Sequence, residues 1–129
     1  MKKLLAMILM LVLSGIALAA EVKLRCEVTS RDDAKTIAQE IFSYDEAAMT
    51  VLGQPANNPP LGSCNGTKGI CNRPFISDEE VWIETFKDGE FVGKRTLDRM
   101  TGGFVINHYG ADRRFPDLSG SCARFNQSF

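Results

Sequence analysis

The chain has 129 residues, with 15 Lys and Arg against 16 Asp and Glu, a length that suits one domain. An apolar fraction of 44% with 24% charged residues excludes a wholly disordered chain and a polytopic membrane protein. The nearly balanced charge also makes nucleic acid an unsuitable partner.

The first residues have the pattern of a secretory signal peptide. Lys2 and Lys3 precede an apolar run over 4–13, and small residues follow as far as Ala20. We therefore expect a signal peptide over 1–19, of a kind typical of bacteria, with export to the periplasm or the medium.

Cleavage after Ala19, or after Ala20 as the neighbouring position, leaves a single secreted β domain over 20–129. This part has 13 basic and 16 acidic residues, a formal charge of −3. Because the apolar run is shorter than the ~20 residues that a membrane span needs, we expect no stable membrane insertion once it is removed.

Four cysteines follow the expected leader, at Cys26, Cys64, Cys71 and Cys122. In an oxidising compartment they predict two disulfides. Three pairings are open, and we favour Cys64 with Cys71, which closes a short loop, and Cys26 with Cys122, which ties the first strand to the last. Zinc is the alternative, but the Cys-x6-Cys spacing differs from that of common zinc sites. We therefore expect no metal and no cofactor.

The clearest strand lies over 22–28, where apolar and polar residues alternate. The next segment has two interpretations. Apolar residues at helical spacing allow a short helix over 32–42, whereas β-branched residues favour a strand over 37–44 that turns into a second strand over 49–52. We prefer the hairpin.

A long loop is predicted over 53–74, since fourteen of these 22 residues are Gly, Pro, Asn, Ser or Thr. Loops of this length in a compact domain are commonly functional or mobile. The expected disulfide would restrain its tip, and the loop is a candidate contact surface, as is the connection over 109–120.

Two strands over 80–87 and 90–97 flank Asp88-Gly89, a strong signal for a type I′ hairpin. A two-residue turn places Trp82 opposite Arg95. A second tight turn at Thr101-Gly102 then places Leu97 opposite Ile106 and Arg95 opposite His108. This register predicts one apolar core face, formed by Trp82, Phe86, Phe91, Leu97, Phe104 and Ile106.

These segments predict a mainly β fold, a small antiparallel barrel or sandwich built as a meander of six to eight short strands and stapled by disulfides. The segment 121–125 would supply the closing strand. No repeat or second domain is visible, and the sequence sets no oligomeric state.

The candidate ligand-binding residues are Trp82, Glu84, Arg95 and His108, which the predicted register places together. Charges that point into a barrel need partners, so we expect Glu84 to pair with Arg95 and Trp82 to lie over Arg95 as a cation–π partner. No motif accompanies His108 that would indicate nucleophilic catalysis, and we expect a protein that is not an enzyme.

The plan of a leader followed by a small disulfide-tied β domain is similar to that of periplasmic lysozyme inhibitors of the membrane-bound or C-type class. The segment Ser119-Gly120-Ser121-Cys122-Ala123-Arg124-Phe125 resembles the Ser-Gly-x-x-Tyr element of that family, without a tyrosine at the expected spacing. The leading hypothesis is a non-enzymatic binding or structural domain whose partner is an envelope protein or a small ligand. The alternative is an inhibitor of a cell-envelope hydrolase such as lysozyme.

Overall fold

A computed structural model describes residues 21–30, 35–57, 64 and 66–125. The expected signal peptide lies outside the described residues. The described residues form nine strands and one 3-10 turn: β1 (Glu21–Ser30), β2 (Thr36–Asp45), β3 (Thr50–Val51), β4 (Gln54–Pro55), β5 (Ile70–Ile76), β6 (Glu80–Lys87), β7 (Glu90–Asp98), β8 (Gly103–His108), η1 (Gly110–Asp112) and β9 (Leu118–Arg124).

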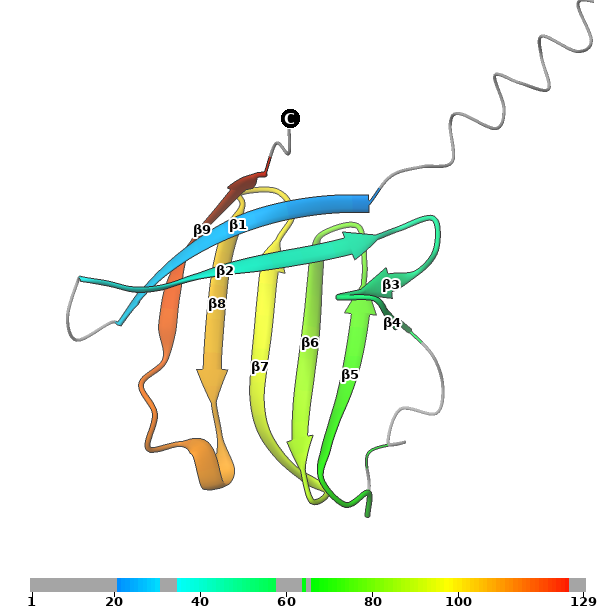
Figure 1. The fold of residues 1–129 in the computed structure, drawn as a ribbon, viewed down its shortest axis with the longest axis vertical. Coiled ribbons are helices and arrows are strands. Elements are labelled where there is room, and N and C mark those ends of the chain that lie inside the picture. Colours follow the sequence, from blue (N-terminus) through cyan, green and yellow to red (C-terminus); the bar gives the residue numbers. More distant parts are fainter. Residues whose placement is uncertain (1–20, 31–34, 58–63, 65, 126–129) are drawn as a thin grey trace, which may run out of the picture.

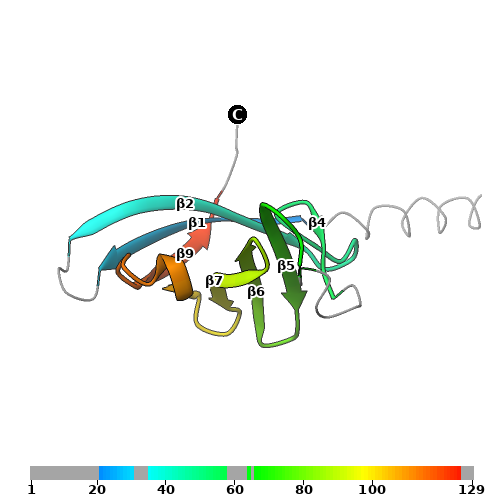
Figure 2. The ribbon, with the colours of Figure 1, turned by 90° about the horizontal axis from the view of Figure 1, so that it is seen from below.

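The strands form one antiparallel sheet in the order β4-β3-β2-β1-β9-β8-β7-β6-β5. The sheet curls so that β1 and β2 cross over β5 to β9 as a second layer (Figures 1 and 2), giving a nearly closed barrel. The predicted fold class is confirmed. The nine strands exceed the predicted number because β4 and β5 lie within the segment 53–74 that was predicted as a loop.

The alternation predicted for the first strand is present in β1. Leu24, Cys26 and Val28 are buried, whereas the intervening Lys23, Arg25 and Glu27 are exposed. Their inward side chains join those of the other strands in one core between the two layers. The core consists of Leu24, Cys26, Val28, Phe42, Tyr44, Val51, Ala56, Ile76, Val81, Ile83, Leu97, Phe104 and Ile106.

The alternative of a helix over 32–42 is wrong for its described part, because residues from Thr36 onward form β2. The predicted turn into a second strand is present as the β2–β3 hairpin. Its turn is stabilised by Asp45, whose Oδ1 accepts from the Ala48 N–H at 3.0 Å. The helical spacing of apolar residues is overridden because a strand there buries Phe42 and Tyr44 against β1.

The predicted loop over 53–74 is too long at both ends. β4 occupies Gln54–Pro55, and β5 begins at Ile70. Asn72, Arg73 and Pro74 give β5 the composition of a loop. However, β5 is an edge strand, and Pro is tolerated on an edge because an N–H group that faces away from the sheet has no partner to lose. Residues 58–63 and 65 lie outside the described part of this loop.

The β6–β7 hairpin has the predicted turn, with positive φ at Asp88 (52°) and Gly89 (83°). Lys87 pairs with Glu90 as predicted, but a β-bulge between Thr85 and Phe86 then shifts the register by one residue. A shift of one residue exchanges the two faces of a strand.

The predicted core face is therefore wrong for β6 and for the start of β7. Val81 and Ile83 fill the core, and Trp82 lies opposite Thr96 instead of Arg95. Three of the predicted core residues remain on the inner face, namely Leu97, Phe104 and Ile106.

The predicted two-residue turn between β7 and β8 is also wrong. Leu97 pairs with Phe104, and Gly93 pairs with His108. Asp98 extends the turn, because its Oδ1 accepts from the N–H groups of Met100 at 2.8 Å and Thr101 at 3.2 Å. The register moves by two residues, which keeps each side chain on its predicted face.

The barrel is closed at one end by Asn57. Its side chain donates to the Ile76 carbonyl and accepts from the Ile76 N–H, both at 2.8 Å, and its own N–H donates to the Pro74 carbonyl at 3.1 Å. At the other end the lower parts of β6, β7 and β8 extend past β2 (Figure 1), and a hollow lined by residues of these strands lies there.

Both favoured disulfides are present. Cys26 and Cys122 join neighbouring strands β1 and β9 over a sequence separation of 96, and Cys64 is joined to Cys71. Two disulfides are compatible with an oxidising extracellular or periplasmic environment. Within the described ranges, no helix has the length and apolar character needed to cross a bilayer.

Candidate functional site

A polar hollow lies on the inner face of the open end. It has a volume of about 170 Å³ and is lined by Thr85, Val92, Gly93, Lys94, Arg95, Ile106, Asn107, His108 and Asp112. Gly93 leaves this space because it carries no side chain between Thr85 on one neighbouring strand and His108 on the other. The site is thus built by β6, β7, β8 and η1.

Arg95 marks the boundary between this hollow and the core. Arg95 pairs with Ile83 of β6 on one side and with Ile106 of β8 on the other, and all three side chains lie on the same face of the sheet. Its guanidinium reaches across to the other layer, where Nε donates to Oε2 of Glu40 at 3.1 Å. Both side chains stay partly exposed, at 39% and 29%, so the pair contributes at most about 1 kcal/mol and its polar groups remain open to a ligand.

His108 ends β8 at the rim of the hollow. Its Nδ1 lies 3.0 Å from the Pro116 carbonyl oxygen, which can only accept, so Nδ1 carries the proton of the neutral ring. The backbone N–H of His108 donates to Oδ1 of Asp117 at 2.9 Å. The connection after β8 therefore orients the ring and leaves Nε2 as its acceptor.

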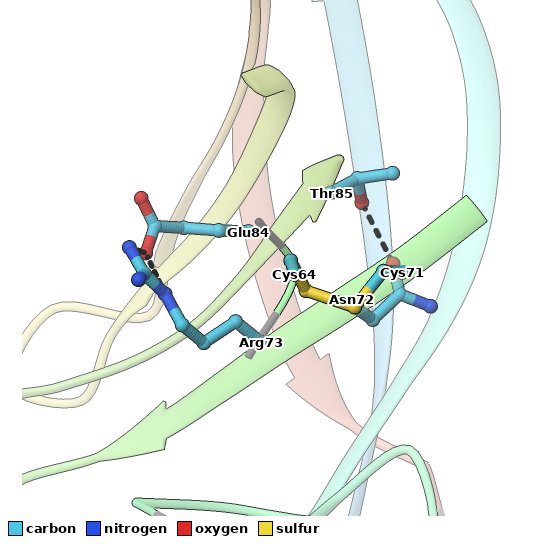
Figure 3. The surroundings of a disulfide bond; sticks show 6 residues. All are labelled: Cys64, Cys71, Asn72, Arg73, Glu84 and Thr85. Carbon is cyan, nitrogen blue, oxygen red and sulfur yellow. Dashed lines mark hydrogen bonds and ion pairs between the residues drawn. A yellow bond between two sulfur atoms is a disulfide. The ribbon is translucent and has the colours of Figure 1, made fainter. Parts of the chain in front are cut away.

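Asn72 and Thr85 extend the polar surface towards the sheet edge. The Thr85 hydroxyl donates to Oδ1 of Asn72 at 3.0 Å, and Figure 3 shows this pair beside the Cys64–Cys71 disulfide. Both side chains are partly buried. They lie on the inner face of the sheet, which also carries Val81 and Ile83 of β6.

Glu84 does not pair with Arg95. The bulge places Glu84 on the outer face, where its carboxylate accepts from Arg73 at 2.6 Å (Figure 3). The register shift separates the two predicted partners, since strand neighbours point to opposite faces of a sheet.

Trp82 also lies on the outer face and does not contact Arg95. Its ring stacks on Phe75 with centroids 4.8 Å apart, and the Lys94 ammonium lies 4.6 Å above it. The aromatic and cationic partners expected at the hollow are therefore on the outside of the barrel.

Of the four predicted ligand-binding residues, the structure brings together only Arg95 and His108. Sequence reasoning missed Glu40 and Gly93, the first because β2 reaches Arg95 only through the curl of the sheet. A signal for the correct faces was present in β6, where Glu80 and Glu84 alternate with Val81 and Ile83.

A larger hollow, of about 380 Å³, lies on the outside between β1 and β9. It is lined by Arg25, Glu27, Ser121, Ala123, Arg124 and Phe125. The Arg25 guanidinium lies 4.7 Å from the centre of the Phe125 ring. Its lining includes four residues of the segment 119–125, but neither Ser119 nor Gly120, the two residues that match the lysozyme-inhibitor element.

No group of three or more His, Cys, Asp or Glu side chains gathers as a candidate metal site in the part of the chain that the structure describes. The polar groups at the open end can instead donate to and accept from a bound molecule.

A comparison with protein-family models finds no match, and comparisons with curated proteins and with solved structures find none either.

Proposed function

We propose that the protein is an exported, non-catalytic binding domain that takes its ligand at the open end of the barrel, around Gly93, Arg95 and His108. One observation carries the proposal. Polar side chains and a glycine occupy inner-face positions that a small closed barrel fills with apolar side chains. The leader pattern and the two disulfides support export.

The non-catalytic part of the proposal rests on the surroundings of His108. The Pro116 carbonyl lies 3.0 Å from Nδ1 and fixes the orientation of the ring, and no nucleophile-elbow sequence accompanies His108. The ring is thereby suited to fixed hydrogen bonding at the rim.

The test is chemical-shift mapping of the isotopically labelled chain with a library of small fragments and short peptides. We expect shifts clustered at Gly93, Arg95, Ile106 and His108. Gly93→Leu should abolish them, because a Cβ at Gly93 meets only the Asn107 carbonyl, at 3.4 Å, and the larger side chain fills the hollow. Thr96→Leu, on the outer face of the same strand, is the matched control.

Shifts that persist in the Gly93→Leu protein, or that map to the Trp82 face, would refute binding at the open end. The export part is tested separately, by the intact mass of protein recovered from the periplasm. Cleavage after Ala19 or Ala20 is the expected result, and a retained leader would contradict it.

A second candidate function is inhibition of a cell-envelope hydrolase such as lysozyme. The favouring observation is the outer hollow, where Arg25 and Arg124 offer guanidinium groups to the paired carboxylates that glycoside hydrolases use. Inhibition assays against several lysozymes, with Arg25→Ala as the comparison, decide the matter. Absence of inhibition at high micromolar concentration would end this candidate.

A further inference from the structure

The free edge of β2 borders the hollow. β2 is ten residues long and pairs with β1 along its length, but on its other side it pairs with β3 only at Tyr44 and Asp45. Among the described residues, no backbone hydrogen bond joins positions 38–42 to any strand other than β1. A row of backbone groups is therefore left facing outward.

The backbone groups on this edge belong to the odd-numbered residues. Ser43 directs its carbonyl away from β1, since that oxygen accepts from the Leu52 N–H at 2.9 Å. The direction alternates along an antiparallel strand, and the register with β1 is unbroken from Ala38 to Asp45. The N–H and C=O groups of Gln39 and Ile41 thus point to the open edge.

This edge lacks Pro and Lys, two of the residues by which proteins prevent strand addition, and its inward charge, Glu40, is paired with Arg95. The segment 36–45 contains no Pro, Lys or Arg, and its pairing with β1 is regular beyond Ala38. By contrast, β5 on the other side of the opening carries Pro74, and its upper part is bonded to Asn57. Unprotected edges are templates for another strand.

A strand added to β2 would lie over the hollow. In Figure 1 the free side of β2 faces the lower parts of β6, β7 and β8, and the Glu40–Arg95 pair joins β2 to the inner face of β7. Only an extended polypeptide offers backbone donors and acceptors at the spacing of this edge.

We propose that the open end binds an extended segment of a partner protein, which adds to the free edge of β2. This inference rests on the proposed function and names its ligand class. Alternate side chains of the segment enter the hollow over Gly93, which suits small or polar residues. The intervening side chains pack beside Ile41, which is 53% exposed, and these positions suit apolar residues.

The test uses linear peptides about 12 residues long, displayed as a random library and selected on the chain. The best binder is synthesised, and its dissociation constant is measured against three proteins. Gln39→Pro removes the edge N–H without touching the β1 ladder, and we expect binding at least about tenfold weaker. Gln39→Ala is the control, since it loses only the side-chain bond to Glu27, and we expect a change below about twofold.

Amide hydrogen exchange supplies the second readout. We expect the Gln39 and Ile41 amides to exchange rapidly in the free chain and to be protected by the peptide. Slow exchange in the free chain would mean that the chain covers its own edge, which overturns the proposal. If the chain self-associates and Gln39→Pro abolishes this association, a second copy occupies the edge of β2, and the proposal is likewise overturned.

The two proposals fail in different ways. A peptide whose binding is lost in Gly93→Leu but unchanged in Gln39→Pro overturns strand addition and leaves the binding site in place. A peptide that binds both variants normally binds elsewhere on the chain and overturns strand addition, and fragment shifts that persist in Gly93→Leu would overturn the site as well. A selection that yields no binder overturns strand addition, while fragments that map to the hollow would still support the site.

Discussion

Gly120 lies where β1 and β9 approach each other closely. It pairs with Val28, and a Cβ at this position would overlap the backbone carbonyl of Glu27. Backbone atoms cannot move aside as the end of a flexible side chain can, so any other residue must push the two central strands apart.

We therefore predict that Gly120→Ala lowers the free energy of unfolding by about 1–3 kcal/mol, because the added methyl group can be accommodated only by a shift of backbone. Gly93→Ala is the control, because its Cβ would meet only the Asn107 carbonyl, at 3.4 Å, and we expect a change below about 1 kcal/mol. Urea denaturation of both proteins measures the difference. Equal stabilities would contradict the close approach.

Asp98 makes the β7–β8 turn sensitive to pH. The backbone N–H groups of Met100 and then Thr101 donate to its carboxylate and hold its pKa below the ordinary value of 3.8. Because the folded pKa is depressed, the stabilisation is present above the unfolded pKa and is lost as the pH falls through the folded value.

We predict that the melting temperature of the wild-type protein falls more steeply below about pH 4 than that of Asp98→Asn, which has no charge to lose. Thermal melts at a series of pH values measure this, and direct NMR titration of the Asp98 carboxyl provides the control. A carboxyl that titrates at or above its ordinary pKa would contradict the assignment.

Among the elements, the hairpins illustrate what a single sequence can predict. Asp88-Gly89 has one favoured turn, and its type was correctly predicted. The bulge between Thr85 and Phe86 has no comparable local signature in the sequence. One extra residue was enough to move Trp82 and Glu84 from the predicted site to the opposite face.

Strand β5 was missed for a related reason. Its residues have a loop composition, and its strand conformation comes from pairing with β6 on one side only. Arg95 and His108 were correctly placed on the same face, because the predicted register of β7 and β8 was wrong by two residues, and a shift of two residues leaves each side chain on its face. Glu40 could not be paired with Arg95 without knowing that the sheet curls.

Asn57 takes the place of a strand at the closed end of the barrel. Its φ of 55° is one that Asn and Gly adopt more readily than other residues. Its side chain satisfies both backbone groups of Ile76, groups that lie next to the core and would otherwise be unpaired.

We predict that Asn57→Gly, which retains the backbone freedom, destabilises the fold by about 1–3 kcal/mol through the two lost hydrogen bonds. Asn57→Ala should cost about 1 kcal/mol more, because it adds the strain of a positive φ. Urea denaturation of the two variants separates the contributions. A Gly variant as stable as the wild type would show that the side chain does not close the barrel.

For the molecule as a whole, the two disulfides differ in the length of chain that they close. Cys26 and Cys122 are separated by 96 residues and Cys64 and Cys71 by 7. On the loop-entropy estimate the longer loop contributes about 4.7 kcal/mol and the shorter about 2.5 kcal/mol, and measured values are commonly smaller.

We predict that Cys26→Ala with Cys122→Ala lowers the stability by about 2 kcal/mol more than Cys64→Ala with Cys71→Ala. Calorimetry of the two double variants under non-reducing conditions measures the difference. The reverse order of stabilities would mean that the short disulfide organises more of the domain than its loop length implies.

The position of β9 has a consequence for how the protein is made. This strand is the last of the nine to leave the ribosome, and it is the one that joins β1 to β8. Until it arrives, the β1–β2 pair and the β5–β8 meander share no ladder, and Cys26 has no native partner while Cys64 and Cys71 are already available to it. The Cys26–Cys122 disulfide therefore cannot form before the final strand has been synthesised, and until then Cys26 can enter disulfide exchange with Cys64 or Cys71.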